Sequence, residues 1–193
     1  MNPPNETDRQ LLRHTIATVA YRVGKALRGA PQTFAAFKAS DSSRTPAHIL
    51  AHMGDLYDWA LATARGEKFW QDSLPLEWSR EVERFFAALK KFDDYLASSE
   101  PLHTSPEKLF QGPIADSLTH VGQIAMLRRI ASCPVKGENY FVAQIATGRV
   151  GQEQAAPAAN STEGLSVPQG RTWFSPCRSG LCWRGCNFFV DCR

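Results

Sequence analysis

Apolar residues recur at three- and four-residue spacing along four long segments of this 193-residue chain, and this pattern limits the fold more than any other feature. The segments cover residues 7–28, 45–66, 79–97 and 113–132. The spacing places the apolar side chains of each segment on one face of an α-helix, and such faces must be buried against one another. No segment shows the alternation typical of a half-buried strand. We therefore predict an all-α fold in which four helices form a bundle.

Residues that favour helix ends mark the boundaries of these segments. Thr7 and Gln10 form a capping box at the start of the first helix. Thr45 precedes a proline at the first helical position of the second helix. The pair Gly112-Pro113 predicts the start of the fourth helix.

The connections and the last helix carry further expectations. Residues 31–44 and 66–77 form connections long enough to cross an end of the bundle, so we expect a topology with at least one crossover connection. The fourth helix is apolar around most of its circumference, which predicts a central position. A short additional helix near the C-terminal end of the domain is predicted over residues 139–146.

Composition and charge argue against several classes of function. Hydrophobic residues make up 43% of the chain and charged residues 21%, which is typical of a soluble globular protein. No apolar run approaches the roughly 20 residues of a membrane helix, and the polar N-terminus lacks the apolar core of a signal peptide. We therefore expect a cytoplasmic protein with no membrane partner. The charges up to residue 154 nearly balance, so they give no basic stripe for nucleic acid.

The C-terminal end differs in composition from the rest of the chain. From Ala155 it is rich in Ala, Pro, Asn, Ser and Gly, and it then mixes aromatic residues, Arg and Cys without a helical period. Four of the five cysteines lie there, and their spacing contains no Cys-x2-Cys pair, which argues against a zinc finger. We expect a helical domain over residues 1–154 and an irregular or disordered tail over residues 155–193. The product of a frameshift would have such an aberrant C-terminus.

Polar residues fall on faces that should be buried. His52 lies on the apolar stripe of the second helix, whereas Asp116 and His120 are four residues apart and share one face of the fourth. A buried carboxylate is costly unless it is paired or binds a metal. Two imidazoles and one carboxylate from two helices can bind Zn²⁺, Ni²⁺, Fe²⁺ or Mn²⁺ and leave a position open for water or substrate. His52, Asp116 and His120 are therefore candidate metal ligands.

Two other interpretations of these residues stay open. A histidine on an apolar stripe is often a hydrogen-bonded core residue, and an aspartate four residues before a histidine can form a local ion pair. Three further residues are candidates to support the ligands or to line a pocket beside them: His48, Gln123 and Trp59.

Two stretches of the chain resemble a known family. TPAHILAHMGDLYDWAL (45–61) and IADSLTHVGQIAMLRR (114–129) are together similar to the DinB-like superfamily of bacterial metalloenzymes. The resemblance covers residues 7–130 and implies a four-helix bundle with one ligand histidine on the second helix and a pair four residues apart on the last. His52 and His120 match the first and last of these positions, and Gly122-Gln123-Ile124 matches the small-Gln-apolar signature that follows. Asp116 stands where the family more often has histidine, which implies a preference for harder ions.

The same resemblance implies a function. Characterised members are metal-dependent transferases and isomerases that use a low-molecular-weight thiol such as mycothiol or bacillithiol, and a hydrolase with a metal-bound water is a close variant. The expected partners are a small-molecule substrate or thiol and a second copy of the chain. The alternative is a non-catalytic bundle that dimerises or binds a ligand, with a structural or residual metal site.

Overall fold

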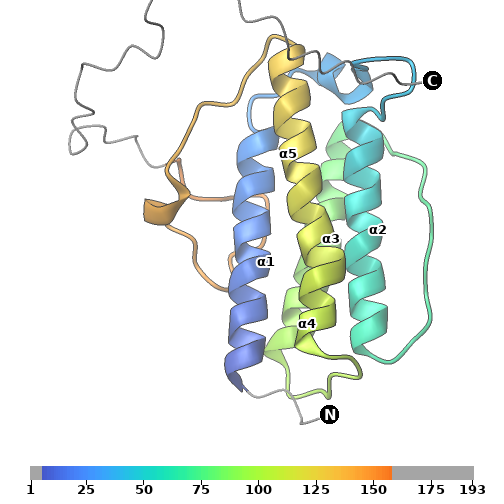
Figure 1. Cartoon of the computed structure of the whole chain (residues 1–193), viewed down its shortest axis with the longest axis vertical. Helices are drawn as coiled ribbons and strands as arrows, with labels where there is room; N and C mark the ends of the chain where they lie inside the picture. The colour runs from blue at the N-terminus through green and yellow to red at the C-terminus, as the bar shows by residue number, and fades with distance from the viewer. Residues whose placement is uncertain (1–5, 158–193) are drawn as a thin grey trace, which may run out of the picture. The chain divides into compact units, whose positions relative to one another are not determined.

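The computed structural model describes residues 6–157, and within that range it contains helices and turns but no strand. Four long helices lie side by side, and two shorter helical segments lead into the last of them (Figure 1). The long helices are α1 (Glu6–Leu27), α2 (Pro46–Ala64), α3 (Trp78–Ala97) and α5 (Ala115–Ile130). The predicted all-α fold is therefore confirmed. None of the helices described here combines the length and apolar character needed to cross a membrane.

Helix ends follow the local sequence closely. The Thr45 hydroxyl accepts a hydrogen bond from the backbone N–H of His48, and Pro46 occupies the first turn of α2. Gly29 and Gly66 follow α1 and α2 with φ of 65° and 79°, a left-handed conformation that glycine adopts without the strain of a Cβ. The chain can therefore leave both helices sharply.

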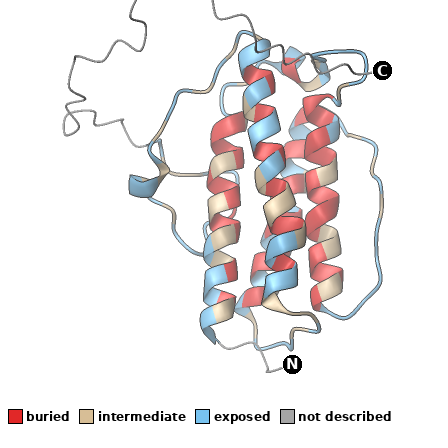
Figure 2. Cartoon of the chain, viewed as in Figure 1, coloured by how far each residue is buried: buried red, intermediate tan, exposed pale blue. Residues whose placement is uncertain are grey.

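The connection between α2 and α3, residues 65–77, runs back along the length of the helices (Figure 1). As a result α2 and α3 point in the same direction, and α1 and α5 point in the opposite direction. The other long connection contains a 3-10 turn, Gln32–Ala36, that packs Phe34 into the core. The core fills the space between the inner faces of the long helices (Figure 2).

The predicted start of the last helix needs refinement: α5 begins at Ala115, shortly after Gly112-Pro113, but it continues a helical path that begins earlier. The helical path begins at α4 (Pro106–Leu109), capped by Ser105, and continues through a π-helical segment, Phe110–Ile114, into α5. Pro113 has no N–H, and in an α-helix its ring would clash with the carbonyl of Leu109. The wider π turn accommodates the proline without ending the helix.

Two further expectations need correction. The last helix is not central, because Thr119, Gly122 and Met126 leave one side of α5 exposed (Figure 2). The helix predicted over residues 139–146 is a three-residue 3-10 turn, Tyr140–Val142. Phe141 is 95% exposed, and no residue of the turn is buried, so packing against the core does not stabilise a longer helix here.

The residues described here belong to one compact unit, which lies within Met1–Asn160. Apart from residues 155–157, the tail predicted to be irregular lies outside the described residues, as do its four cysteines.

Candidate metal centre

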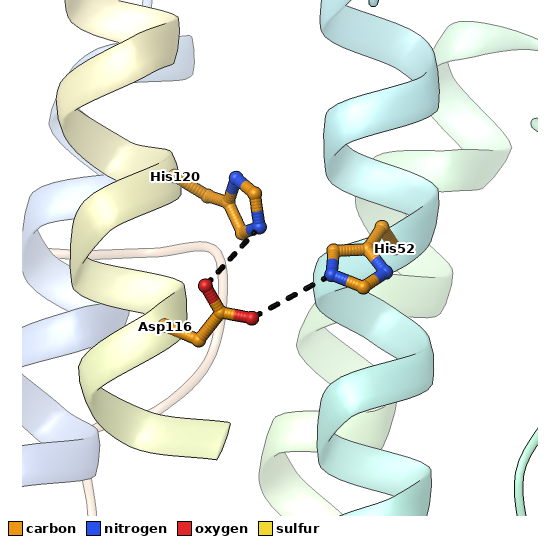
Figure 3. A group of neighbouring side chains, drawn as sticks. All are labelled: His52, Asp116 and His120. Atoms are coloured by element: carbon orange, nitrogen blue, oxygen red, sulfur yellow. Dashed lines mark ion pairs between the residues drawn. The ribbon is translucent and has the colours of Figure 1, made fainter. Parts of the chain in front are cut away.

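Helix α2 presents His52 toward α5 from the middle of its length (Figure 3). The histidine side chain is about four-fifths buried, while its neighbours Ala51 and Met53 are fully buried in the core. His52 therefore lies at the edge of the apolar stripe rather than inside it. A residue in that position can keep one ring nitrogen accessible to a ligand.

Helix α5 supplies the facing residues, Asp116 and His120, one helical turn apart (Figure 3). The carboxylate lies between the two imidazoles. Asp116 Oδ2 is 3.7 Å from His52 Nε2, and Asp116 Oδ1 is 3.5 Å from His120 Nε2. The two rings are nearly perpendicular, with centroids 4.9 Å apart. The structure thus brings together the three residues predicted to be ligands.

Gln123 determines which nitrogen of His120 faces the group. Its amide oxygen lies 2.8 Å from His120 Nδ1, and because a carbonyl oxygen only accepts, Nδ1 carries the proton and donates it. The lone pair of the neutral ring is then on Nε2, the atom that points toward Asp116. An acceptor on the second nitrogen is the usual way in which proteins orient a metal-binding histidine.

The surroundings of His52 keep its imidazole neutral. Burial lowers its pKa below the ordinary value, and the nearby His120 and Arg44 lower it further. Asp116 acts in the opposite direction but does not reverse the shift. The neutral form is the one that binds a metal, so His52 is available as a ligand near neutral pH.

The spacing of the three side chains suits a single ion. One ligand atom from each of them lies within 4.8 Å of the other two. In a tetrahedral zinc site, bonds of about 2.0–2.1 Å place neighbouring ligand atoms roughly 3.3 Å apart. The distances from the Asp116 oxygens to the two histidine nitrogens, 3.5 Å and 3.7 Å, are slightly longer, so the three side chains would draw together around a bound ion. Three protein ligands leave at least one coordination position open.

Two tryptophans lie beside the group. The ring of Trp70, in the connection between α2 and α3, meets His52 edge to face at a centroid distance of 5.9 Å. Trp59, predicted to line a pocket, meets Trp70 in the same way at 6.0 Å. Of these two tryptophans, only Trp59 was predicted from the sequence to lie beside the ligands.

Asp55 explains how Trp70 reaches this place. Its carboxylate accepts hydrogen bonds from the Ser73 backbone N–H at 2.8 Å, the Ser73 hydroxyl at 2.7 Å and the Gln71 amide at 3.2 Å. These bonds fix the connection against α2 on both sides of residue 72, within a few residues of Trp70. Asp55 is fully buried, and sequence periodicity alone could not identify its partners.

The remaining histidines lie elsewhere. His48 is exposed, and its Nδ1 lies 2.7 Å from the Thr45 hydroxyl at the start of α2, so the structure does not bring this candidate into the group. His14 and His103 are also exposed, on α1 and in the loop before α4. Cys133 is partly buried beyond the end of α5.

Comparison with protein-family models, with curated proteins and with solved structures finds no significant match for this chain. The function must therefore be argued from the geometry of the site.

Proposed function

We propose that this chain is a divalent-metal-dependent enzyme whose metal centre is built by His52, Asp116 and His120. The observation that carries the proposal is the convergence of these three donors from two helices around one point. Among the described residues no other group of His, Cys, Asp or Glu has this arrangement. Its donor set suits Zn²⁺, Ni²⁺, Fe²⁺ or Mn²⁺, and the carboxylate favours the harder ions of that series.

We further propose that the fold is a four-helix bundle of the DinB-like type with a crossover connection. Three features support this assignment: the four long helices, the parallel course of α2 and α3, and the placement of His52 and His120 on the second and last of them. Gln123, from the signature after the last histidine, makes the hydrogen bond to His120 that a metal ligand requires.

The residues of this chain have distinct roles in the proposed reaction. His52 and His120 provide ring nitrogens, Asp116 provides a carboxylate oxygen, and Gln123 holds the His120 ring in the required tautomer. Trp70 packs edge to face against His52 and so helps to hold this ring in place. A bound divalent ion would act as a Lewis acid that lowers the pKa of a coordinated thiol or water. The reaction class is thus a thiol-dependent transfer or isomerisation, or a hydrolysis.

Elemental mass spectrometry on the full chain tests this proposal. Cys177, Cys182, Cys186 and Cys192 are first replaced by serine so that they cannot contribute metal. After supplementation with each of the four ions, the parent should retain close to one equivalent of one of them. His52→Ala/His120→Ala should retain none, whereas the exposed pair His14→Ala/His103→Ala should behave like the parent. Absence of metal from the parent, or equal metal in both double variants, would overturn the proposal.

A non-catalytic bundle that dimerises is the second candidate. The observation that favours it is the exposed apolar pair Leu11 and Phe110, which line a shallow groove between α1 and α4. In that case the metal would be structural, and its removal should lower the free energy of unfolding substantially. An enzyme with an open centre should lose turnover with a smaller loss of stability. Chemical denaturation of the metal-free and metal-loaded chain distinguishes the two.

A further inference from the structure

A pocket of about 200 Å³ lies between the second half of α2 and the segment that leads into α5, which includes the π-helical turn. Its lining is mainly apolar and includes Trp59, Ala60, Leu109 and Pro113. Thr63 and Lys108 are among the polar residues on its wall. Small-molecule sites in proteins are commonly mostly apolar pockets with a few polar groups of this kind.

The pocket and the metal centre share one stripe of α2. Trp59 and Thr63 lie seven and eleven residues after His52, so all three point in nearly the same direction from the helix axis. Trp59 is about 10 Å further along the axis. Because helical side chains lean toward the N-terminus, the Trp59 indole leans back toward His52. Trp59 contacts Trp70, and Trp70 contacts His52, so the two tryptophan rings connect the pocket to the proposed metal centre.

The last helix repeats this arrangement. Gly112, on the pocket wall, precedes Asp116 by one turn. A Cβ at position 112 would lie 3.5 Å from the Trp59 ring, an ordinary van der Waals distance, so this ring packs directly against the π-helical segment. The π turn at Phe110–Ile114 widens the helix at the same level, and such turns often occur at functional sites.

We propose that this pocket binds an apolar arm of the substrate whose reacting group is held at the metal centre. The proposal rests on the proposed function and adds a substrate class: a metal-binding head group joined by a short chain to a ring-sized apolar group. Lys108 gives the far end of the arm a preference for negative charge. No carboxylate of the described residues lies within ion-pair distance of its ammonium group, so an anionic substituent would be its first partner.

Hydroxamates of increasing length test the arm directly, because their head group chelates a metal and their substituent can be varied. The full chain with the four tail cysteines replaced is loaded with the ion found by elemental analysis and titrated calorimetrically. Acetohydroxamate measures the head group alone. 3-Phenylpropanohydroxamate should bind at least about fivefold tighter, since its ring becomes buried. A carboxylate in the para position of that ring should tighten binding further, and Lys108→Gln should remove this additional gain.

Filling the pocket provides the decisive variant. Thr63→Phe should abolish the gain from the ring while leaving acetohydroxamate binding unchanged, and Thr63→Leu serves if the larger residue prevents folding. Thr18→Phe is the matched control, because Thr18 is also a half-buried helical threonine but lies on α1 outside the pocket. A ring that adds no affinity, or a gain that survives in both Thr63 variants, would overturn the pocket assignment. A chain that binds no metal would instead overturn the proposed function itself.

Discussion

Two carboxylates, one on α2 and one on α5, have opposite surroundings. Asp55 belongs to α2, and its side chain is 1% exposed and accepts hydrogen bonds from Gln71, Ser73 and, on α3, Arg84. Asp116, on the side of α5, has a side chain that is 45% exposed, and its closest partners are two imidazoles at 3.5 Å and 3.7 Å. The first carboxylate accepts four hydrogen bonds from the protein, whereas the second retains capacity for a ligand.

The difference separates a structural cluster from a binding site. Burial alone would raise the pKa of Asp55, but the hydrogen bonds from Ser73, and then from Arg84, outweigh it and hold the pKa below its usual value. Arg84 also donates to the buried Glu81 at 2.8 Å and to the Ala51 carbonyl at 2.6 Å. A network in which every member is satisfied fixes a fold. The group around Asp116 instead brings three potential ligand atoms within 4.8 Å of one another.

Removing the cation of the structural cluster should have the largest effect. Arg84→Met leaves Asp55 and Glu81 buried without their counter-charge, and we expect the free energy of unfolding to fall by about 3 kcal/mol. Urea denaturation by circular dichroism measures this. The control Arg80→Met removes an arginine whose side chain is 74% exposed on the same helix, and it should change stability by less than about 0.5 kcal/mol.

The same variant distinguishes the two regions. A folded fraction of Arg84→Met should still bind one equivalent of metal, since no ligand contacts Arg84 directly. His52→Ala should show the reverse pattern, with near-parent stability in the absence of metal and no bound ion. Equal loss of metal and of stability in both variants would show that the two regions form one cooperative unit, and the distinction between them would fail.

The sequence predicted those parts of the molecule that depend on local signals. The starts of α1, α2 and α3 lie within one residue of the predicted positions. The predicted cap is confirmed at α2, where Thr45 acts on its own neighbours. Thr7 instead lies inside α1, and the Gln10 amide donates to Glu6 rather than completing a capping box. The approach of Asp116 to His120 followed from the geometry of one helix, and that of His52 from the apolar stripe of another. These are properties of a single segment and its period.

The features that the sequence did not predict depend on contacts between segments. The π turn at Pro113 belongs to a helical path that begins seven residues earlier, at Pro106. The sequence did not predict this path, because a proline usually indicates the start of a helix or a break in it. The contact of Trp70 with His52 requires hydrogen bonds from residues 71 and 73 to Asp55, across 16 and 18 positions of sequence. The 3-10 turn at Tyr140–Val142 replaces a helix because its apolar residues face outward. No local pattern carries this information.

A smaller effect is expected at the residue that supports the proposed centre. Gln123→Leu removes the acceptor for His120 Nδ1, so the ring loses its fixed tautomer, and metal affinity should fall about tenfold to a hundredfold. Competition with a chromophoric chelator measures the affinity. Gln10→Leu is the matched control, because Gln10 is also an exposed helical glutamine with one side-chain hydrogen bond, to Glu6. A Gln123 variant that binds metal as tightly as the control would exclude this role.

The smallest effect is the pH dependence of stability in the metal-free chain. The pKa of His52 is lowered in the folded state, so the unfolded chain takes up its proton first as the pH falls. This contribution to stability is present above the ordinary pKa of about 6.5 and is lost as the pH falls from there through the lower pKa of the folded state. His52→Gln should therefore lose less stability than the parent between about pH 7 and 5 in urea denaturation.

The control is His14→Gln, at an exposed position of α1, which should keep the pH dependence of stability of the parent. The Asp55 cluster cannot mimic this difference, because the lowered pKa of Asp55 places its loss of stability below about pH 4. A slope in this window that is unchanged in His52→Gln would assign it to other groups and remove one argument for a neutral ligand at this position.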